Sequence, residues 1–401
     1  MHRRNKYDVL IAGSGPAGLA TALYLLRIRP ALTGRIAAIE RARHPRPKIC
    51  AGGLIPRTIT ALDELGIALE VPAVQVFAGI ARTETGCINL EPSIEPLCTI
   101  VRRNEFDAML AQHARVAGLE IVDDTRVLAV EQRGETAIVT TDRGVFEGRA
   151  LVGADGSGSR VRSSLFRRTK HNIGRALVTE VPVGAGQAEE FVKRSYRFDF
   201  NCVATGIRGY CWSFPCVIEG EPHLSLGIYD QNPVPVSRRE LIEQLRAAFP
   251  EIDSLSSENA TRVFKGFPVR WYDAQDCYVQ GCVILAGDAA GVDPLMGEGI
   301  SYAFEHGKLA ASAIARYLEG DRSALKGYGT QLHRSMIGTK LRRLAFAARR
   351  FYGTHHRIYF RLAGVSSKLQ QMGVDGFNGA RRVDELSIAR AALRSILYGS
   401  A

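Results

Sequence analysis

The apolar positions at the start of the chain predict a strand, a helix and a second strand. The first strand is expected over Tyr7–Ala12, and the glycine turn at Gly13–Gly18 follows it directly. A helix over Leu19–Arg27 then leads to a second apolar strand over Arg35–Glu40. Because a βαβ unit of this kind opens a parallel sheet, we predict an α/β domain at the beginning of the chain.

Farther along, two buried strands are expected to end in polar turns. Ala150–Ala154 ends at Asp155-Gly156, and Cys282–Ala286 ends at Gly287-Asp288. Periodic apolar residues predict two helices, over Phe106–Val116 and Ile300–Leu318. Three alternating runs predict an antiparallel ribbon, at Val127–Val130, Ala137–Thr141 and Val145–Gly148.

The middle of the chain has a different pattern, rich in strands and aromatic residues. One helix, Arg238–Ala248, interrupts strand-like runs at Tyr196–Phe200, Tyr210–Phe214 and Leu224–Tyr229. We therefore predict a discontinuous α/β domain, an inserted β-sheet substrate domain and a basic helical C-terminal region. Their expected bounds are 1–70, 96–170 and 265–320 for the first, 71–95 and 171–264 for the second, and 321–401 for the third.

The composition is that of an ordinary globular protein. The chain has 401 residues, of which 46% are hydrophobic and 23% charged, and a chain of this length buries a core without disulfides or metals. Its eight cysteines are scattered without C-x-x-C spacing, which is typical of a reducing compartment, and no metal site is expected. Asp8 and the glycine turn interrupt the N-terminal apolar run, so we expect a cytoplasmic protein without a signal peptide or membrane span.

The net charge of +11 is concentrated in one segment. Residues 333–382 contain eleven Lys and Arg and a single acid, and they carry +10 while the rest of the chain carries +1. Arg343, Arg350 and Arg357 recur every seven residues and predict a basic stripe, with Arg342 and Arg349 alongside. This stripe suits anionic membrane headgroups, an acidic electron donor or a diphosphate substrate, or it is the solvated face of a packing helix. No nucleic-acid motif accompanies it, so we expect no nucleic acid. The apolar face is expected to contain Leu341, Leu344, Ala348 and Phe351.

The glycine turn carries the first candidate chemistry. Gly13, Gly15 and Gly18 form a G-x-G-x-x-G pattern, which serves a tight turn, the close approach of a pyrophosphate and helix–strand packing. The positive end of the following helix attracts the phosphates. Glu40 ends the second strand, where a carboxylate accepts a hydrogen bond from an adenosine ribose. The sequence therefore predicts a dinucleotide site.

Two acidic turns and a glycine loop extend this site. An Asp that follows a parallel strand points to the crevice where ligands bind in open α/β sheets. Asp288 is therefore expected to accept a hydrogen bond from a flavin ribityl hydroxyl, whereas Asp155 is expected to organise its loop. The loop Pro294–Gly299 leads into the helix that starts at Ile300, whose free N–H groups would stabilise an anionic reduced ring.

Together these motifs resemble the flavoprotein superfamily of p-hydroxybenzoate hydroxylase. The resemblance rests on Gly13–Gly18, Arg103–Asp107, Asp155-Gly156 and Gly287-Asp288. Within the superfamily, residues 48–54, 210–215 and 297–300 are similar to the geranylgeranyl reductase family, and the similarity extends from residue 7 to about residue 320. It implies a Rossmann-like FAD-binding domain of the glutathione reductase type, with an inserted antiparallel β-sheet substrate domain and a C-terminal helical tail.

The resemblance also implies which residues hold FAD and which take part in catalysis. Arg103 would contact FAD, Cys50–Gly53 would lie beside the isoalloxazine, and Tyr210–Pro215 would line a cavity for an isoprenoid chain. The candidate catalytic residues are Cys50, Tyr210 and Trp212. The candidate cofactor-binding residues are Gly13, Gly15, Pro16, Ala17, Gly18, Glu40, Arg41, Lys48, Cys50, Ala51, Gly52, Arg103, Asp155, Gly287, Asp288, Pro294, Gly297, Gly299 and Ile300.

Two positions depart from the reductase pattern. Ala51 stands where the family has the first glycine of a Gly-Gly-Gly run. Tyr229 stands where the Gly-x-Gly motif, here starting at Gly227, has its second glycine. A ring at position 229 would reshape or shorten the substrate pocket.

The candidate catalytic residues each have a second interpretation. A cysteine thiol at the flavin can position substrate or donate a proton, but Cys50 is also interpretable as a small buried residue in a tight turn. Tyr210 and Trp212 share one strand face, and they either line the cavity or pack in the core.

The resemblance implies an FAD-dependent oxidoreductase that reduces alkenes of a geranylgeranyl-type prenyl lipid by hydride transfer from reduced flavin. Cys50 or water would supply the proton. Only one dinucleotide fingerprint is present, so the reductant is expected to be transiently bound NADPH or a ferredoxin-like protein. The basic tail adds an expected peripheral membrane contact.

Two other functions stay open. The first is an FAD-dependent monooxygenase or halogenase, because Tyr210–Pro215 differs little from the Trp-x-Trp-x-Ile-Pro motif of halogenases. The second is a non-catalytic membrane-surface or RNA-binding protein on a flavoprotein scaffold.

Overall fold

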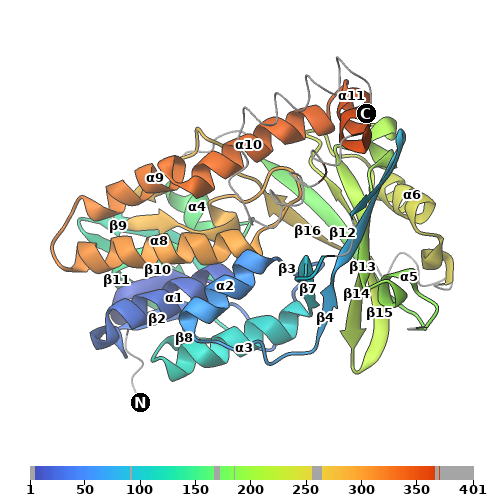
Figure 1. Ribbon diagram of the computed structural model, residues 1–401. Helices are drawn as coiled ribbons and strands as arrows, with labels where there is room; N and C mark the ends of the chain where they lie inside the picture. Colours follow the sequence, from blue (N-terminus) through green and yellow to red (C-terminus); the bar gives the residue numbers. More distant parts are fainter. Residues whose placement is uncertain are drawn as a thin grey trace.

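Two large sheets stand side by side in the computed structural model, and helices cover the outer faces (Figure 1). The structure describes residues 5–90, 93–166, 172–184, 186–254, 264–365 and 370. Helices lie in front of the first sheet in this view, and the second sheet lies at the opposite end of the molecule.

The first sheet has eight strands among the described residues. Five of them run parallel, and they include the predicted βαβ start. In order across the sheet the strands are β17 (Val279–Gln280), β18 (Val283–Leu285), β11 (Gly144–Gly153), β1 (Lys6–Ala12), β2 (Ile36–Ile39) and β8 (Glu120–Val122), with β10 (Thr136–Thr141) and β9 (Val127–Arg133) extending from β11. Its helices are α1 (Pro16–Ile28), α3 (Arg103–Val116), α4 (Arg160–Leu165) and α8 (Ile300–Leu318).

One expectation for this sheet was wrong. Val145–Gly148 and Ala150–Ala154 were predicted as separate strands, but they form the single strand β11. Its first half pairs antiparallel with β10 and its second half parallel with β1. Arg149, the polar residue between the two runs, does not end the strand, because its guanidinium reaches the surface 3.4 Å from the Asp8 carboxylate.

The second sheet has seven strands among the described residues and is antiparallel except for one pair. Its order is β16 (Lys265–Arg270), β12 (Ile173–Pro182), β15 (Glu221–Asp230), β14 (Gly209–Ile218), β13 (Ser195–Asp199), β5 (Ala78–Thr83) and β6 (Gly86–Leu90). Only β13 and β5 run parallel. Helices α5 (Glu189–Val192) and α6 (Arg238–Ala248) flank this sheet, and α6 buries a separate apolar core that includes Leu226, Ile228 and Leu245.

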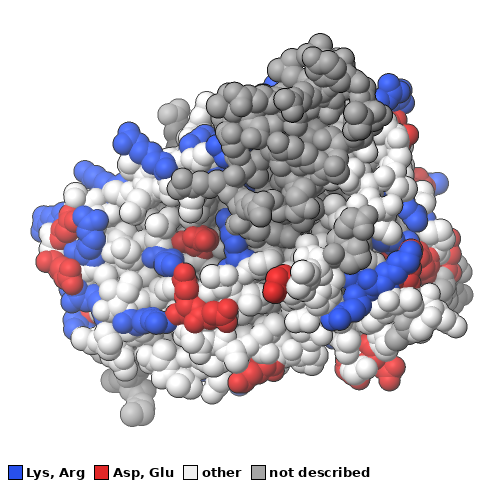
Figure 2. All heavy atoms as spheres, in the orientation of Figure 1, with Lys and Arg blue, Asp and Glu red and all other residues white. Residues whose placement is uncertain are grey.

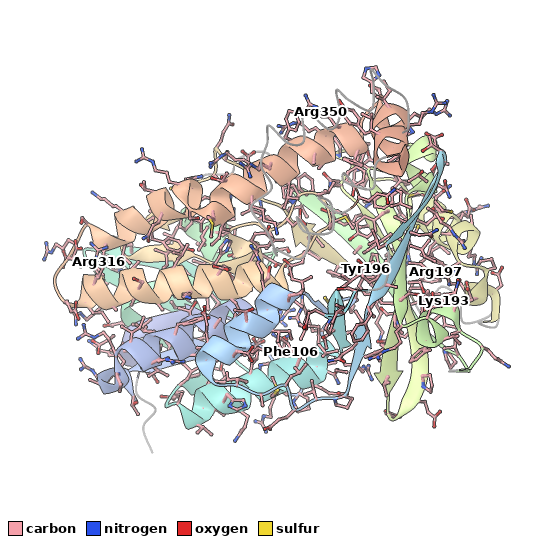
Figure 3. The ribbon with its side chains drawn as sticks, in the orientation of Figure 1. Phe106, Lys193, Tyr196, Arg197, Arg316 and Arg350 are labelled. Carbon is pink, nitrogen blue, oxygen red and sulfur yellow. The ribbon has the colours of Figure 1, made fainter. Side chains whose placement is uncertain are left out.

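Large aromatic rings cover the face of this sheet that looks toward the first sheet. Tyr196 and Arg197 are consecutive on β13 and project to opposite sides (Figure 3). Two rings lie flat over glycines of the neighbouring strand. A Cβ at Gly227 would lie 2.1 Å from Cζ2 of Trp212, and one at Gly79 would lie 2.5 Å from Cε2 of Tyr196. The glycines therefore make room for the aromatic face.

A small third sheet joins the two large ones. It contains β3 (Gly53–Leu54), β7 (Cys98–Val101) and β4 (Ala73–Val76), and helix α2 (Pro56–Leu65) follows β3. Of the strands expected in the segment 71–95 of the substrate domain, β5 and β6 belong to the seven-stranded sheet but β4 pairs with β7.

The tail is helical as far as the structure describes it. Helix α9 (Ala324–Arg334) is followed by α10 (Met336–Phe351), which crosses above both sheets, and by α11 (His356–Val365) (Figure 1). Leu341 and Ala348 are buried on α10, which confirms the apolar face expected there.

The prediction of one continuous basic stripe was wrong, because the chain turns between α10 and α11. Arg343 and Arg350 lie on α10, whereas Arg357 lies on α11 and its Nε is 2.9 Å from Glu84 Oε2. His356 Nε2 also lies 2.6 Å from that carboxylate. The predicted basic residues Lys368, Arg381 and Arg382 lie outside the described residues.

Acidic and basic side chains are interspersed on the face shown in Figure 2, wherever it is not drawn in grey. None of the helices in the described ranges combines the length and the apolar character that crossing a bilayer requires.

We expect Gly227→Ala to destabilise the protein by about 1–3 kcal/mol, because the added methyl group collides with the Trp212 ring. Urea unfolding followed by circular dichroism measures this change. Gly186→Ala is the matched control, since its Cβ would meet nothing within 4 Å. Equal midpoints for the two variants would contradict this account of the aromatic face.

Candidate functional site

The ends of four parallel strands meet at one edge of the eight-stranded sheet. Backbone hydrogen bonds of 2.9 Å join them in sequence: Gly13 N donates to Ile39 O, Ala154 N to Ala12 O, and Ala286 N to Gly153 O. The three separated motifs that follow β1, β11 and β18 therefore become neighbours. This juxtaposition is the one that the sequence predicted.

The glycine turn at this edge has no room for side chains on its inner side. Gly13 has φ of +96°, and a Cβ there would lie 2.5 Å from the Ala154 carbonyl oxygen. A Cβ at Gly18 would lie 2.1 Å from Gly13 O. Pro16 and Ala17 form the first turn of α1, which carries no acidic residue. Its free N–H groups therefore suit an anionic group such as a pyrophosphate.

Glu40 lies buried beside this turn. Its Oε2 accepts hydrogen bonds from the backbone N–H (2.9 Å) and the hydroxyl (3.0 Å) of Ser14. Arg46 lies between two carboxylates, 3.6 Å from Glu40 and 3.5 Å from Asp107. It also reaches the glycine turn, since a Cβ at Gly15 would lie 3.6 Å from Nη2 of Arg46. A cation at this place complements phosphate charge.

The sequence analysis missed Arg46, which reaches the turn. The predicted Arg41 is exposed. Both lie in the same basic run after β2, and the sequence carries no signal that separates them. His44 was also missed: its Nε2 lies 2.8 Å from the Ser14 hydroxyl.

The two acidic turns have different roles. Asp155 accepts from the Ser159 hydroxyl and from the backbone N–H groups of Arg160 and Val161, so its carboxylate starts α4 as the sequence suggested and is not free for a cofactor. Asp288 accepts from Ser157 at 3.0 Å and faces Gly299, where a Cβ would lie 3.1 Å from its Oδ1. Asp288 is thus the carboxylate that stays available at the crevice.

A buried histidine supports the turn before Asp288. His306 of α8 accepts a 3.0 Å hydrogen bond from Gly287 N on its Nδ1. Burial lowers the pKa of His306 to about 4, so the ring is a neutral acceptor at physiological pH. A Cβ at Gly287 would lie 2.6 Å from Cβ of Ala17, so glycine is required there.

The loop before α8 is held by its carbonyl groups. Gln231 Nε2 donates to Pro294 O, Tyr352 donates to Leu295 O at 2.7 Å, and Tyr210 donates to Met296 O. The Pro294 carbonyl is thus occupied by Gln231, and Pro294 is not among the residues that line the pocket described below. At the start of α8 the Ser301 N–H is taken by the Glu298 carboxylate, so Gly299 and Ile300 are the residues whose N–H groups can serve a ligand there.

An apolar pocket lies between this loop and the aromatic face of the seven-stranded sheet. It contains about 730 Å³ of space not filled by protein atoms, including the part open to solvent. Burial raises the pKa of Tyr229 and Cys98 in its wall. The lining residues from the sheet are Ala176, Phe198, Tyr210, Trp212, Phe214, Tyr229, Phe267 and Val269, and those opposite are Cys50, Ala51, Gly52, Gly53, Ile55, Cys98, Met296, Gly297, Glu298, Gly299 and Ile300.

The segment Cys50–Gly53 forms the part of the wall nearest the first sheet. A Cβ at Gly52 would lie 1.9 Å from Val101 O, so glycine is required there. Ala51, which departs from the reductase pattern, lines the pocket. Gly52 N–H donates to Cys50 Sγ at 3.5 Å.

Arg103 lies buried behind this segment. It forms a two-point ion pair with Asp107, with Nε–Oδ1 at 2.7 Å and Nη2–Oδ2 at 3.1 Å. Burial opposes its charge, but the Asp107 carboxylate, with a smaller contribution from Cys50, holds the pKa of Arg103 above its usual value. Lys48 lies near the pocket with its ammonium 5.5 Å from the ring centre of Phe267.

The candidate catalytic residues are all in the pocket wall, but they differ in what they present. Tyr210 uses its hydroxyl to hold Met296, so only its ring faces the pocket. Trp212 presents its indole over Gly227. Cys50 is half-buried and belongs to the pocket wall, and its Sγ accepts from the Gly52 N–H at 3.5 Å. His306, Gln231 and Tyr352 were missed, since each acts on a residue far away in the sequence.

We expect the free energy of unfolding to fall as the pH falls from about 6.5 to about 4. In this range His306 is protonated in the unfolded chain but stays neutral in the folded protein, where burial lowers its pKa. His306→Asn keeps an acceptor for Gly287 but cannot be protonated, and it should remove on the order of 3 kcal/mol of this loss. Urea unfolding at several pH values is the measurement. Exposed His355→Asn is the control and should leave the slope unchanged.

Comparison with known proteins agrees with this geometry. The FAD binding domain family matches residues 6–341. The chain is 28% identical over 338 residues to a geranylgeranyl diphosphate reductase of Rhodobacter capsulatus, covering 80% of this chain and 78% of the relative.

Solved structures share the fold. A geranylgeranyl bacteriochlorophyll reductase-like protein of Thermoplasma acidophilum superposes with a TM-score of 0.74 at 20% identity, covering 98% of this chain and 96% of that one. A flavin-dependent brominase gives a TM-score of 0.69 at 19% identity, covering 98% and 99%. The glycine cradle, the four strand ends and the match over most of the chain lead to one conclusion: the chain belongs to the FAD binding domain family, a family of FAD-dependent oxidoreductases within the superfamily of p-hydroxybenzoate hydroxylase-like monooxygenases.

Proposed function

We propose that this protein is an FAD-dependent reductase of alkene bonds in a geranylgeranyl-type prenyl chain. The observation that carries the proposal is the apolar pocket between the aromatic sheet face and the Cys50–Gly53 segment, opening onto the start of α8. Relatives named for geranylgeranyl reduction support the same assignment.

The described residues fit FAD as an extended ligand along the strand ends. The glycine turn, the start of α1 and Arg46 would hold the pyrophosphate, Glu40 the adenosine side, and Asp288 the ribityl chain. Gly299 and Ile300 would face the flavin ring with their N–H groups, whereas the Gly297 N–H donates to Asp293 O at 3.1 Å. When bound, the reduced flavin supplies the hydride.

The chain's own contribution is to orient the prenyl substrate and to exclude water. Isolated alkenes are poor hydride acceptors, so the reacting carbon must be held close to the donor and away from solvent. The rings of Phe198, Trp212 and Phe214 provide a continuous apolar wall for this purpose. The fixed loop at Met296 keeps the opposite wall in place.

The proton for the second alkene carbon is assigned to Cys50 or to water. Of the candidate catalytic residues in the pocket wall, Cys50 is the one with a thiol, and the Tyr210 hydroxyl is engaged with Met296 O. Cys50 would therefore be the proton donor or would position the water that is.

The reductant and the place of action are proposals of the same kind. NADPH or a ferredoxin-like donor would reduce the flavin, and the basic helices α9–α11 would contact an acidic donor or an anionic membrane surface of the cytoplasmic side. Membership of an FAD-dependent oxidoreductase family argues against the non-catalytic alternative.

A second candidate function is an FAD-dependent monooxygenase or halogenase. The specific observation in its favour is Tyr229, a ring in the pocket where the reductase pattern has glycine. The fold shared with a brominase is compatible with it.

Anaerobic reaction of the chemically reduced holoprotein with geranylgeranyl lipids tests the main proposal. We expect products that gain two hydrogens per turnover, measured by mass spectrometry. Cys50→Ser should slow the reaction by tenfold or more with FAD retained, because a serine hydroxyl is a much weaker acid. Products that gain oxygen or halogen, and that form only when oxygen is present, would contradict the reductase proposal and support the monooxygenase or halogenase.

We also expect Asp288→Ala to weaken FAD retention by roughly tenfold or more, because a hydrogen bond to a charged group is lost at the crevice. Absorbance of the flavin after gel filtration measures retention. Asp155→Ala is the matched control: it should lower stability through α4 without this selective loss of FAD. A fully yellow Asp288→Ala protein would show that the ribityl assignment is wrong.

A further inference from the structure

A buried ion pair lies behind the Cys50–Gly53 segment of the pocket wall. Arg103 and Asp107 are one turn apart on α3, and they are 7% and 0% exposed. Two contacts join them, Nε to Oδ1 at 2.7 Å and Nη2 to Oδ2 at 3.1 Å. A buried ion pair often contributes no more to stability than apolar side chains of the same size, so its place beside the pocket points to a functional role.

Backbone pairing brings Cys50 level with this ion pair. Strands β3 and β7 are antiparallel neighbours. Their pairing continues beyond β3 in the same register, because Val101 N donates to Gly52 O at 3.0 Å. Two residues farther along each chain are Cys50 and Arg103, the first residue of α3. The segment that carries the candidate proton donor and the helix that carries the guanidinium are therefore held together by the small third sheet.

Cys50 and Asp107 act on the same guanidinium. Burial alone would lower the pKa of Arg103, but the charge of Asp107 and then the Cys50 side chain outweigh it and raise that pKa. The interaction between two charged groups is mutual, so an Arg103 cation that Cys50 stabilises also stabilises the Cys50 thiolate. The Asp107 carboxylate opposes the thiolate, because it offsets part of the Arg103 charge.

Two ionisable groups on the neighbouring strands also interact with Cys50. They are the Cys98 thiol of β7 and the Tyr210 hydroxyl of β14. Burial raises the pKa of both, so each stays neutral and neither stabilises nor repels a thiolate by its charge.

The charged side chains on the other sides of the pocket have partners of their own. The Glu298 carboxylate accepts from the backbone N–H and the hydroxyl of Ser301 at 2.8 and 2.6 Å. The Lys48 ammonium lies over the Phe267 ring, 5.5 Å from its centre. The Arg103 guanidinium is therefore the cation whose interaction with Cys50 the described residues support.

We propose that Arg103 and Asp107 are positioning residues for Cys50. The guanidinium stabilises the thiolate that is left when the thiol gives up its proton, and the carboxylate orients the guanidinium and offsets part of its charge. In the proposed reaction the S–H bond breaks, its electron pair stays on sulfur, and the proton forms a C–H bond at the second alkene carbon. Water then returns a proton to the thiolate. The use of this proton rests on the proposed function, whereas the effect on the thiol does not.

Alkylation of Cys50 in the FAD-loaded full-length protein tests the pair without any turnover. Iodoacetamide reacts with thiolates, and peptide mass spectrometry gives the rate at each cysteine over a range of pH values. The exposed Cys277 is the reference within each sample. At neutral pH we expect Arg103→Gln to slow the alkylation of Cys50 by about tenfold, and Asp107→Asn to accelerate it by about threefold or more. Arg103→Lys keeps the charge and should stay within about threefold of the parent protein.

The matched control is Arg102→Gln. Arg102 precedes Arg103 in the chain, but its Nη2 lies 3.7 Å from the Glu180 carboxylate of β12, so this variant should leave the Cys50 rate unchanged. At high pH, where the thiol is ionised in every variant, the rates at Cys50 should converge. A merely structural role would instead change Arg103→Gln and Asp107→Asn in the same direction at every pH.

Several results would overturn the inference. They are equal rates in all variants, changes of the same sign in Arg103→Gln and Asp107→Asn, and no alkylation of Cys50 at any pH. If Asp107→Asn does not fold, as judged by circular dichroism, the contrast between Arg103→Gln and Arg103→Lys decides alone. The expected rates in a protein that reduces no alkene would uphold the pair and reject the proposed reaction, and alkene reduction with unchanged rates would do the opposite.

Discussion

Parallel hydrogen bonding between β18, β11, β1 and β2 is the constraint on which the rest of the structure depends. It aligns the ends of strands that finish at residues 12, 39, 153 and 285. Glycines, a carboxylate and a helix start that are far apart in the chain therefore face a single crevice. Without this register the glycine turn would be an ordinary bend, because neither Glu40 nor Asp288 would lie near it.

The pocket depends on a second constraint, the anchoring of the loop before α8. Its three successive carbonyls are held by side chains from the second sheet and from the tail, over separations of 63, 86 and 57 residues. The helical tail thus supports the loop beside the pocket through the hydrogen bond of Tyr352 to Leu295 O. A change at the end of α10 would be transmitted to the place where the cofactor and substrate would meet.

The aromatic face illustrates how glycines can shape a binding surface without touching a ligand. Gly227 and Gly79 accommodate the Trp212 and Tyr196 rings, and Gly174 accommodates Tyr229. The rings lie flat because the neighbouring strand offers no side chain. A pocket wall of this kind is apolar over most of its area, so the few polar atoms in it determine how a ligand is oriented.

The sequence by itself determined the elements that depend on near neighbours in the chain. The glycine turn, the long helix from Ile300 to Leu318, the helix Arg238–Ala248 and the aromatic strand at residues 210–215 all follow from local pattern and periodicity. The order of the motifs also predicted the family, because each motif sits at the end of an apolar strand. A hydrogen bond between two polar side chains that are distant in the sequence produces no local pattern that could predict it.

Only the tertiary structure decided which side chains face the site. It brought Arg46 to the Asp107 carboxylate and engaged the Tyr210 hydroxyl with Met296. It also joined two predicted strands into β11 and divided the basic stripe between two helices. In each case the outcome depends on contacts between residues distant in the sequence, whose relative positions local propensity does not encode.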